Sequence, residues 1–152
     1  MRPLQQFEGA PVPLFDRLSD DAPGVRAEAE PRRVLDLDGL TASVGREIET
    51  LLNTRCPLKE EDIDYKTRSV IDYGLVDIAP YFTRSVDDRR RLSQHIARTI
   101  AVYEPRLTRV SVTIEDMSRE THRLLARVDG AVRYGNVVHP VSFPVHVSQG
   151  DE

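Results

Sequence analysis

The sequence contains very few cysteine and aromatic residues. Its 152 residues include a single cysteine, Cys56, and no tryptophan, beside five tyrosines and four phenylalanines. One cysteine cannot form a disulfide within the chain, and no basic segment followed by an apolar one opens the sequence, so we expect a cytoplasmic protein. No apolar stretch approaches the roughly 20 residues that a membrane-spanning helix needs, so we expect no direct membrane insertion.

The sequence also lacks an excess of basic residues. Its formal net charge is −4 at pH 7, and its isoelectric point is about 5.6. Proteins that bind nucleic acid neutralise phosphates with lysine and arginine, so we do not expect nucleic acid as a partner. A length of 152 residues is typical of one domain.

Motifs of catalysis and of metal binding are missing as well. The four histidines are spread over different predicted elements, and no cysteine pair accompanies them. The sequence has no glycine-rich phosphate loop and no Gly-x-Ser-x-Gly motif. We therefore expect no cofactor, no metal ion and no catalytic residue.

The N-terminal part reads mainly as a tail. Residues 1–33 are rich in proline, acidic residues and arginine, and have little periodic apolar pattern, so we expect this part to be largely flexible. Residues 14–18 are the exception, because Leu14, Phe15 and Leu18 share one face of a short helical segment. This segment either docks on the parent domain or anchors another subunit by placing its apolar face in a groove.

Two amphipathic helices are predicted in the remainder, residues 34–148. Apolar residues recur at steps of three and four over Leu37–Thr54, and again over Val86–Tyr103. In each segment one stripe is expected to face a core while charged residues face water. The loop that follows the first helix, around residues 58–63, is highly charged and is expected to be solvated.

Alternating apolar and polar residues predict three strands. They are expected at about residues 109–115, 122–128 and 141–147, with a hairpin turn at Asp129-Gly130. Residues Ser69–Leu75 are expected to form a short β-type or turn segment, predicted as a weak strand, where Gly74 permits the positive φ of a sharp turn. Together these elements predict an α+β fold: a small single domain with two main helices packed on a mostly antiparallel sheet of three or four strands.

The helix-to-strand junction contains the most distinctive short motif, Glu104-Pro105-Arg106-Leu107, here called the corner. Proline fixes its own φ, lacks an N–H, and moves the preceding residue out of the helical region. A carboxylate and a guanidinium held on such a backbone suit a planar, two-pronged contact. The corner is therefore predicted to bind a partner, unless Glu104 and Arg106 pair with each other and brace the monomer.

A second candidate contact is the last predicted strand. Its apolar residues Val141, Phe143 and Val145 alternate with polar residues and with Pro144. Because Pro144 cannot donate to a strand ladder, we expect this strand to lie at a sheet edge. An edge strand is open to the addition of a strand from another protein, so Val141, Phe143 and Val145 are predicted to bind a partner.

Peptidoglycan hydrolysis is an alternative function that the corner could serve. A glycosidase needs two carboxyl groups, one of them protonated to act as a general acid. Glu104 is the candidate at a distinctive position, but a neighbouring Arg106 favours the charged carboxylate. The few aromatic residues also leave few faces on which sugars could stack.

Four segments carry a resemblance to a known family. They are Leu14–Leu18, Val44–Arg55, Asp72–Leu75 and Tyr103–Leu107. In this order they resemble the TssE family, the baseplate wedge subunits of bacterial type VI secretion systems, which are similar in turn to a baseplate wedge protein of contractile phage tails. The resemblance covers roughly residues 14–147. One departure is Val76-Asp77, where a proline is expected before the aspartate.

The resemblance implies a small α+β baseplate wedge domain that joins the wedge subunits TssF and TssG, contacts the first ring of sheath subunits and helps to start sheath assembly. It places the protein in the cytoplasm, at a baseplate docked on the inner-membrane complex. It associates Glu104, Pro105 and Arg106 with wedge assembly, and it implies that the label lysozyme-like does not describe an activity. A peptidoglycan hydrolase and a small regulatory binding module remain the alternatives.

Overall fold

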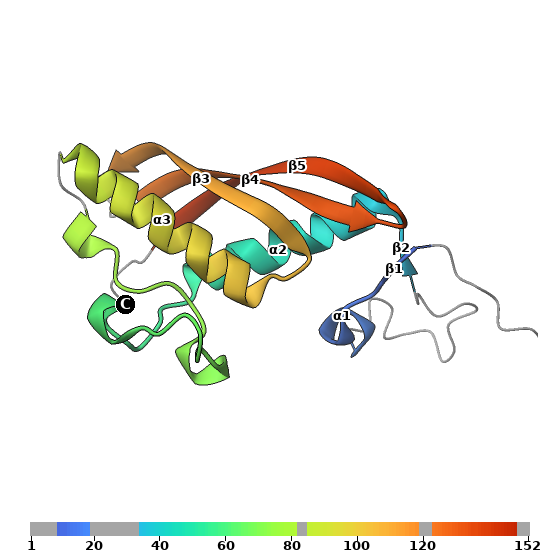
Figure 1. Ribbon diagram of the computed structural model, residues 1–152, viewed down its shortest axis with the longest axis horizontal. Coiled ribbons are helices and arrows are strands. Elements are labelled where there is room, and N and C mark those ends of the chain that lie inside the picture. Colours follow the sequence, from blue (N-terminus) through green and yellow to red (C-terminus); the bar gives the residue numbers. More distant parts are fainter. Residues whose placement is uncertain (1–8, 19–33, 82–84, 119–122, 149–152) are drawn as a thin grey trace, which may run out of the picture.

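The computed structural model describes residues 9–18, 34–81, 85–118 and 123–148. Most of the predicted flexible tail, residues 1–8 and 19–33, lies outside the described residues. In the described part, two long helices cover one face of a three-stranded antiparallel sheet (Figure 1). The predicted α+β fold is therefore confirmed. None of the helices in this part is long and apolar enough to cross a membrane.

The two long helices form where the apolar periodicity predicts them. Helix α2 spans Leu37–Asn53 and helix α3 spans Val86–Tyr103. Asp36 caps α2, because its Oδ1 accepts a hydrogen bond of 2.8 Å from the Gly39 N–H. The apolar stripes of both helices are buried in the core: Leu40, Val44, Ile48, Leu51 and Leu52 from α2, and Leu92, Ile96 and Ile100 from α3.

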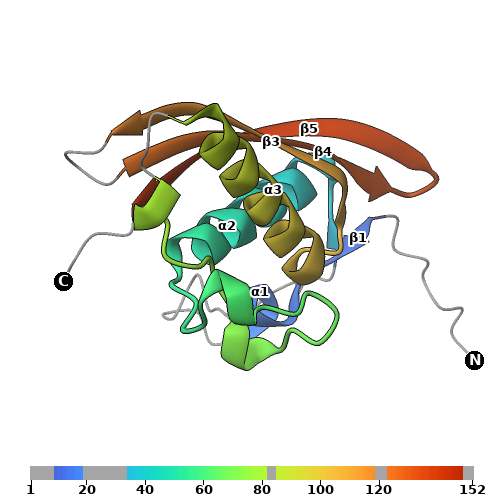
Figure 2. The same cartoon turned by 60° about the vertical axis from the view of Figure 1, so that its left-hand side comes forward.

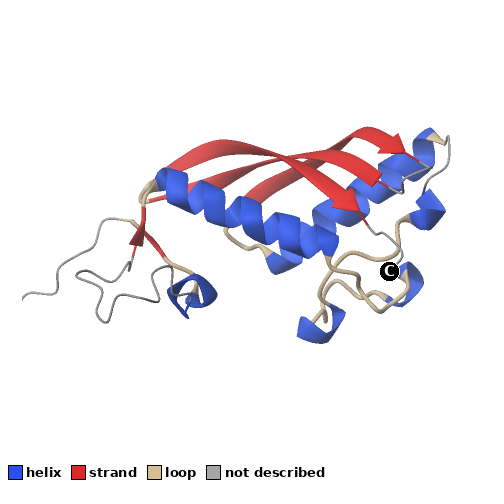
Figure 3. Cartoon of the chain, turned by 180° about the vertical axis from the view of Figure 1, so that it is seen from behind, coloured by secondary structure: helices blue, strands red, loops and turns tan. Residues whose placement is uncertain are grey.

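The main sheet consists of β3 (Leu107–Ser118), β4 (Arg123–Tyr134) and β5 (Val137–Ser148), in the order β3-β4-β5. Seen from behind, the sheet arches over the two helices (Figure 3). Its inner face supplies buried residues to the core: Leu124, Ala126, Val128, Val132, Val145 and Val147. Its outer face is polar, and Arg127 lies there between Glu115 and Asp129 at 3.3 and 3.4 Å. This one-sided burial explains the alternating sequence pattern.

The predicted turn at Asp129-Gly130 is wrong, because both residues lie inside β4. The hairpin turns instead at Gly135 and Asn136, where Gly135 has φ +58°, between the paired residues Tyr134 and Val137. Gly130 serves a packing role: a Cβ there would lie 2.7 Å from Leu107 Cδ1 and 3.1 Å from the Thr108 carbonyl oxygen. The glycine thus allows the start of β3 to approach β4 closely.

Residues 54–81, here called the lobe, extend below the helices (Figures 1 and 2). They contain three 3-10 turns, η1 (Glu60–Asp62), η2 (Val70–Asp72) and η3 (Ala79–Tyr81). The weak strand predicted over residues 69–75 is therefore wrong for most of its length, although Leu75 forms a single parallel bridge with Arg55. Gly74 has φ +114°, and a Cβ there would lie 2.4 Å from the Thr54 carbonyl oxygen.

The described N-terminal residues lie beside this domain. Strand β1 (Ala10–Pro11) pairs antiparallel with β2 (Val34–Leu35), and helix α1 spans Leu14–Leu18. Leu14 is 66% exposed and Leu18 is 72% exposed. These two leucines are therefore not what holds α1 to the domain.

Replacing Gly130 by alanine should destabilise the fold by about 1–3 kcal/mol, because the added methyl overpacks against Leu107 and the β3 backbone. Urea unfolding measures the change. The matched control is Gly135→Asn, since nothing lies within 4 Å of a Cβ at that position and asparagine tolerates its positive φ. Equal unfolding midpoints for the two variants would contradict the packing role of Gly130.

Candidate partner-binding site

The corner is a tight turn that joins α3 to β3. Glu104 ends the helix, and its N–H still donates to the Ile100 carbonyl at 2.8 Å. Pro105 cannot continue the helical hydrogen bonds, and the Leu107 N–H returns to the Glu104 carbonyl at 3.1 Å. The backbone direction between the longest helix and the sheet is thereby fixed.

Glu104 and Arg106 pair within the monomer. Arg106 Nε donates to Glu104 Oε1 at 2.8 Å, and Arg106 Nη2 donates to Oε2 at 2.5 Å. The Arg106 backbone N–H donates to Oε1 at 3.1 Å. The Glu104 side chain is 4% exposed and the Arg106 side chain 28%. The hydrogen bonds from Arg106 to Glu104 raise the pKa of Arg106. The pairing that the brace interpretation requires is therefore present in the monomer.

The third guanidinium nitrogen of Arg106, Nη1, connects the corner to two other helices. This nitrogen donates to Ser43 Oγ on α2 at 3.0 Å. The same hydroxyl donates to Asp16 Oδ2 on α1 at 3.3 Å, and Arg46 binds that carboxylate oxygen at 3.2 Å. Helix α1 is thus seated on the domain through polar contacts with Asp16, while Leu14 and Leu18 face outward.

The roles of Ser43 and Asp16 at the corner were not predicted from the sequence. The available signal was Ser43 itself, a polar residue between Leu40 and Val44 on the apolar stripe of α2, where it is 1% exposed. A hydroxyl in such a place requires a hydrogen-bond partner. The sequence cannot say which residues provide it.

The four predicted corner residues do not all reach the surface. Pro105 is exposed and Arg106 is partly exposed, whereas Glu104 and Leu107 are each 3% exposed. A partner at this place therefore meets Pro105 and the outer side of Arg106. Both oxygens of the Glu104 carboxylate accept hydrogen bonds from Arg106, which leaves the carboxylate poorly placed to act as a general acid.

The position of β5 at a sheet edge is confirmed, but the three apolar side chains that were predicted to bind a partner are buried or partly buried. Phe143 is 9% exposed and Val145 is 3% exposed, and Val141 is partly buried. These side chains pack in or against the core, so they are not available for a contact along the edge, which leaves the backbone groups of β5 for strand addition.

The free edge of β5 is closed at one end. Asn53, the last residue of α2, donates through Nδ2 to the His146 carbonyl at 2.9 Å and accepts from the Ser148 N–H at 3.0 Å. The backbone groups of a strand alternate between its two sides, and His146 and Ser148 direct theirs at Asn53. The N–H and carbonyl groups of the even-numbered residues of β5 therefore point away from β4. Pro140 and Pro144 share this parity, which agrees with the unbroken register between β4 and β5.

An open groove of about 410 Å³ runs beside this edge. Its walls come from α2 and β5 and include Gly45, Arg46, Ser142 and Pro144. At Gly45 a Cβ would lie 3.2 Å from Phe143 Cδ1, so the helix passes close to the strand. A segment added to β5 would lie beside this groove.

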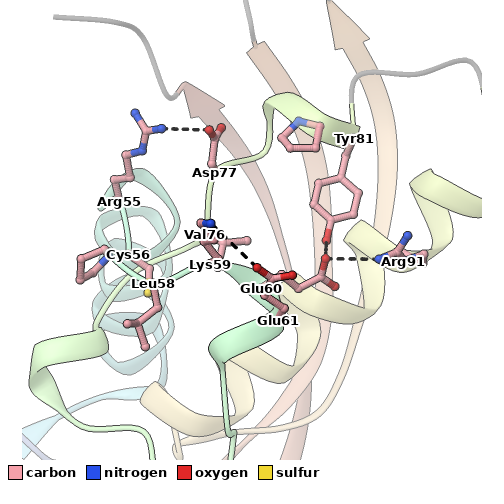
Figure 4. A pocket seen from close by; sticks show the side chains of 12 residues that line it. Arg55, Cys56, Leu58, Lys59, Glu60, Glu61, Val76, Asp77, Tyr81 and Arg91 are labelled. Atoms are coloured by element: carbon pink, nitrogen blue, oxygen red, sulfur yellow. Dashed lines mark hydrogen bonds and ion pairs between the residues drawn. The ribbon is translucent and has the colours of Figure 1, made fainter.

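A larger pocket, of about 710 Å³, opens between the lobe and α3 (Figure 4). Tyr81 donates its hydroxyl to the Glu60 carboxylate, which Arg91 also approaches at 3.4 Å. Burial and the hydrogen bond to Glu60 raise the pKa of Tyr81. The other charged residues that line the pocket are paired as well: Arg55 with Asp77 at 2.9 Å, and Lys59 with Glu61 at 3.9 Å.

The described residues hold no cluster of three histidine, cysteine, aspartate or glutamate side chains that could bind a metal ion. His95 on α3 is 3% exposed and shares a hydrogen bond with the Tyr65 hydroxyl through Nδ1. Its Nε2 is buried and has no hydrogen-bond partner among the described residues. Burial lowers the pKa of His95 to about 4, while nearby Glu60 opposes this shift and Arg68 and Arg98 add to it.

The free energy of unfolding should fall as the pH decreases from about 6.5 to about 4. In the unfolded chain His95 takes up a proton near pH 6.5, but in the folded chain only near pH 4, so acid favours unfolding, by at most about 3 kcal/mol. Urea unfolding between pH 7 and pH 4 measures the slope. His95→Gln should flatten it, and the exposed control His146→Gln should not. Equal slopes for wild type and His95→Gln would contradict this account.

Two solved structures are similar to this chain. The structure is similar to a chain of the baseplate complex from the type VI secretion system, with a TM-score of 0.52 and 22% identity, over 74% of this chain and 97% of that chain. It is also similar to a candidate tail lysozyme from Geobacter sulfurreducens, with a TM-score of 0.49 and 17% identity, over 78% of this chain and all of that one (100%). No curated protein sequence matches the chain.

The comparison with family models shows the family of the chain as well as its fold. Residues 38–137 match the family described as baseplate wedge protein gp25. The matched region contains α2, the lobe, α3, the corner, β3 and β4. Because the match spans well over half of the 152 residues, the chain belongs to the baseplate wedge protein family and is a structural baseplate subunit.

Proposed function

We propose that this chain is the TssE-type wedge subunit of a type VI secretion baseplate, and that it acts without enzymatic activity. The family match over residues 38–137 carries the proposal. The fold shared with a chain of a type VI baseplate complex supports the choice of machine. The proposed place of action is the cytoplasmic baseplate docked on the inner-membrane complex.

The proposed partners are the wedge subunits TssF and TssG and the first ring of sheath subunits. Two features of the structure suit such contacts. The corner offers Pro105 and the outer side of Arg106 on a rigid turn, and β5 offers part of a free sheet edge. We assign the corner to the wedge subunits and the β5 edge to the sheath.

In this proposal the main role of the corner is structural: the pair of Glu104 and Arg106 holds neighbouring elements in place. A buried ion pair specifies geometry more than it adds stability, because desolvation offsets much of the attraction. Through Ser43 and Asp16 the pair sets the position of α1 as well as the direction of β3. The exposed Leu14 and Leu18 then face outward from a fixed helix, which favours the interpretation of α1 as an anchor for another subunit.

Strand addition at β5 should use only a short window of the edge. Asn53 already occupies the His146 and Ser148 groups, and Pro140 and Pro144 have no N–H. Over residues 138–144 the outward-facing donors are thus the N–H groups of Val138 and Ser142. An added strand would find a β5 carbonyl acceptor at each outward-facing residue of this window, but only the N–H groups of Val138 and Ser142 as donors.

The hydrolase alternative is weakened by the state of Glu104. A general acid needs a proton to give, whereas both oxygens of this buried carboxylate accept hydrogen bonds from Arg106. Release of sugar fragments from purified peptidoglycan by the wild-type protein, lost in Glu104→Gln, would revive this alternative. Nothing in the geometry specifically favours the regulatory module.

The contact role of Arg106 needs a double variant, because Arg106→Ala alone leaves Glu104 as an unpaired buried charge and should cost about 3–5 kcal/mol. Glu104→Gln/Arg106→Met removes both charges and should remain folded. We expect it to bind the purified TssF–TssG complex at least about tenfold more weakly, a loss equivalent to about 1.4 kcal/mol.

The matched control for this double variant is Arg127→Met, which removes an exposed arginine from the outer face of the sheet. Calorimetric titration measures affinity, and thermal unfolding checks the fold. A folded double variant with wild-type affinity would exclude the corner from the wedge contact.

Strand addition at β5 is tested by Ser142→Pro. The Ser142 N–H points away from β4, so its loss leaves the ladder intact, and Pro140 and Pro144 already fit this strand. We expect binding of purified sheath subunits to fall at least about tenfold while the unfolding temperature changes little, since strand addition depends on main-chain hydrogen bonds. Ser142→Ala, which keeps the N–H, is the control. Unchanged sheath binding in a folded Ser142→Pro variant would rule out this edge.

A further inference from the structure

Two neighbouring apolar side chains project from the η2 turn of the lobe. Val70 is 87% exposed and Ile71 is 78% exposed, and both belong to η2. We propose that these two residues, here called the peg, insert into an apolar socket bordered by a basic side chain on another baseplate subunit. The inference rests on the proposed function only for the identity of that partner.

The backbone of the peg is fixed by its own turn. Ser69 Oγ accepts from the Ile71 N–H at 3.3 Å, and Asp72 Oδ2 accepts from the Ser69 N–H at 3.2 Å, which together form a capping box. The Tyr73 N–H returns to the Val70 carbonyl at 3.4 Å. The turn therefore holds both side chains in one arrangement before any partner binds.

The turn is also anchored to α3. Tyr103 donates its hydroxyl to the Ser69 carbonyl at 2.8 Å, so the last residue of the helix holds the base of the peg. Arg68 Nη2 donates to the carbonyls of Asp72 at 2.6 Å and Gly74 at 2.9 Å. Its guanidinium lies 4.8 Å from the centre of the Tyr103 ring. The contacts of Arg68 are partly buried, the contact of Tyr103 with Ser69 is exposed, and none of them involves the side chains of Val70 and Ile71.

Rigidity makes the exposed pair suited to binding. Val and Ile are branched at Cβ and have few side-chain rotamers, so little conformational entropy is lost when a socket encloses them. Neither side chain contributes buried area to the core of this chain. Tyr103 immediately precedes Glu104, so the turn that carries the peg is joined to the corner through one residue of α3, and the peg is expected to extend the wedge contact proposed there.

The charge of the turn indicates the chemistry of the socket. The turn carries two charges: the half-buried Arg68 guanidinium, which is directed at two backbone carbonyls, and the Asp72 carboxylate, which accepts from the Ser69 N–H beside the peg. A partner surface that encloses Val70 and Ile71 must therefore face this negative charge. A lysine or arginine at the rim would complement it, whereas an acidic rim would be repelled.

The first test compares Val70→Ser/Ile71→Ser with wild type for binding to the purified TssF–TssG complex. Affinity should fall roughly 10- to 100-fold, with an unchanged unfolding temperature because both side chains are exposed. Val86→Ser is the matched control, since Val86 is 79% exposed but lies at the start of α3. Wild-type affinity in the peg variant would overturn the proposal and leave the wedge assignment intact.

If the wild-type protein does not bind TssF–TssG, a second measurement tests the peg separately from the proposed TssE-type function. The variant Ile71→p-benzoylphenylalanine, expressed in the native cells, is photo-crosslinked and the attached peptides are identified by mass spectrometry. Crosslinks to an apolar segment of another baseplate subunit next to lysine or arginine would support the peg. Crosslinks to a second copy of this chain, to lipid, or to no other molecule would overturn it.

Discussion

The ion pair between Glu104 and Arg106 sets the relation among the elements that form the interaction surfaces. Glu104 is nearly inaccessible to water, so its charge requires the three hydrogen bonds that Arg106 supplies. The turn that makes these bonds possible ends α3 and starts β3. Because Arg106 also binds Ser43, the same pair fixes α2 and, through Asp16, α1. A local charge pair thus determines the geometry of four elements.

In the sheet, one face builds the core, whereas the outer face and the β5 edge remain for contacts. Both long helices cover its inner face, and the outer face carries charged residues such as Arg127. Asn53 closes one end of the β5 edge, and two prolines remove donors from the rest. Such features are common devices that protect an edge strand from indiscriminate pairing. The edge that remains is short, which favours one specific added strand over general aggregation.

The sequence predicts the long elements well, because helix and strand periodicities are local properties. It misplaces the hairpin turn because the role of Gly130 depends on Leu107, a residue far away along the chain. It identifies Phe143 and Val145 as contact residues, although alternation alone cannot tell which face of an edge strand is buried. It leaves the pairing of Glu104 open, since the same motif fits a brace and a partner contact equally well.

The peg shows the converse case, in which the sequence predicts burial and the structure exposes the residues. Val70 and Ile71 are β-branched and adjacent, so the sequence pattern suggests a strand, and burial is the usual expectation for such residues. In the structure they are exposed, because the side chains of Arg68, Ser69 and Tyr103 bind the backbone of the turn and none of these bonds needs the Val70 or Ile71 side chain. Side chains that contribute nothing to the core are free to meet another protein. Among the described residues nothing buries Val70 and Ile71, and a fixed turn that presents both of them is therefore best explained by a contact outside the chain.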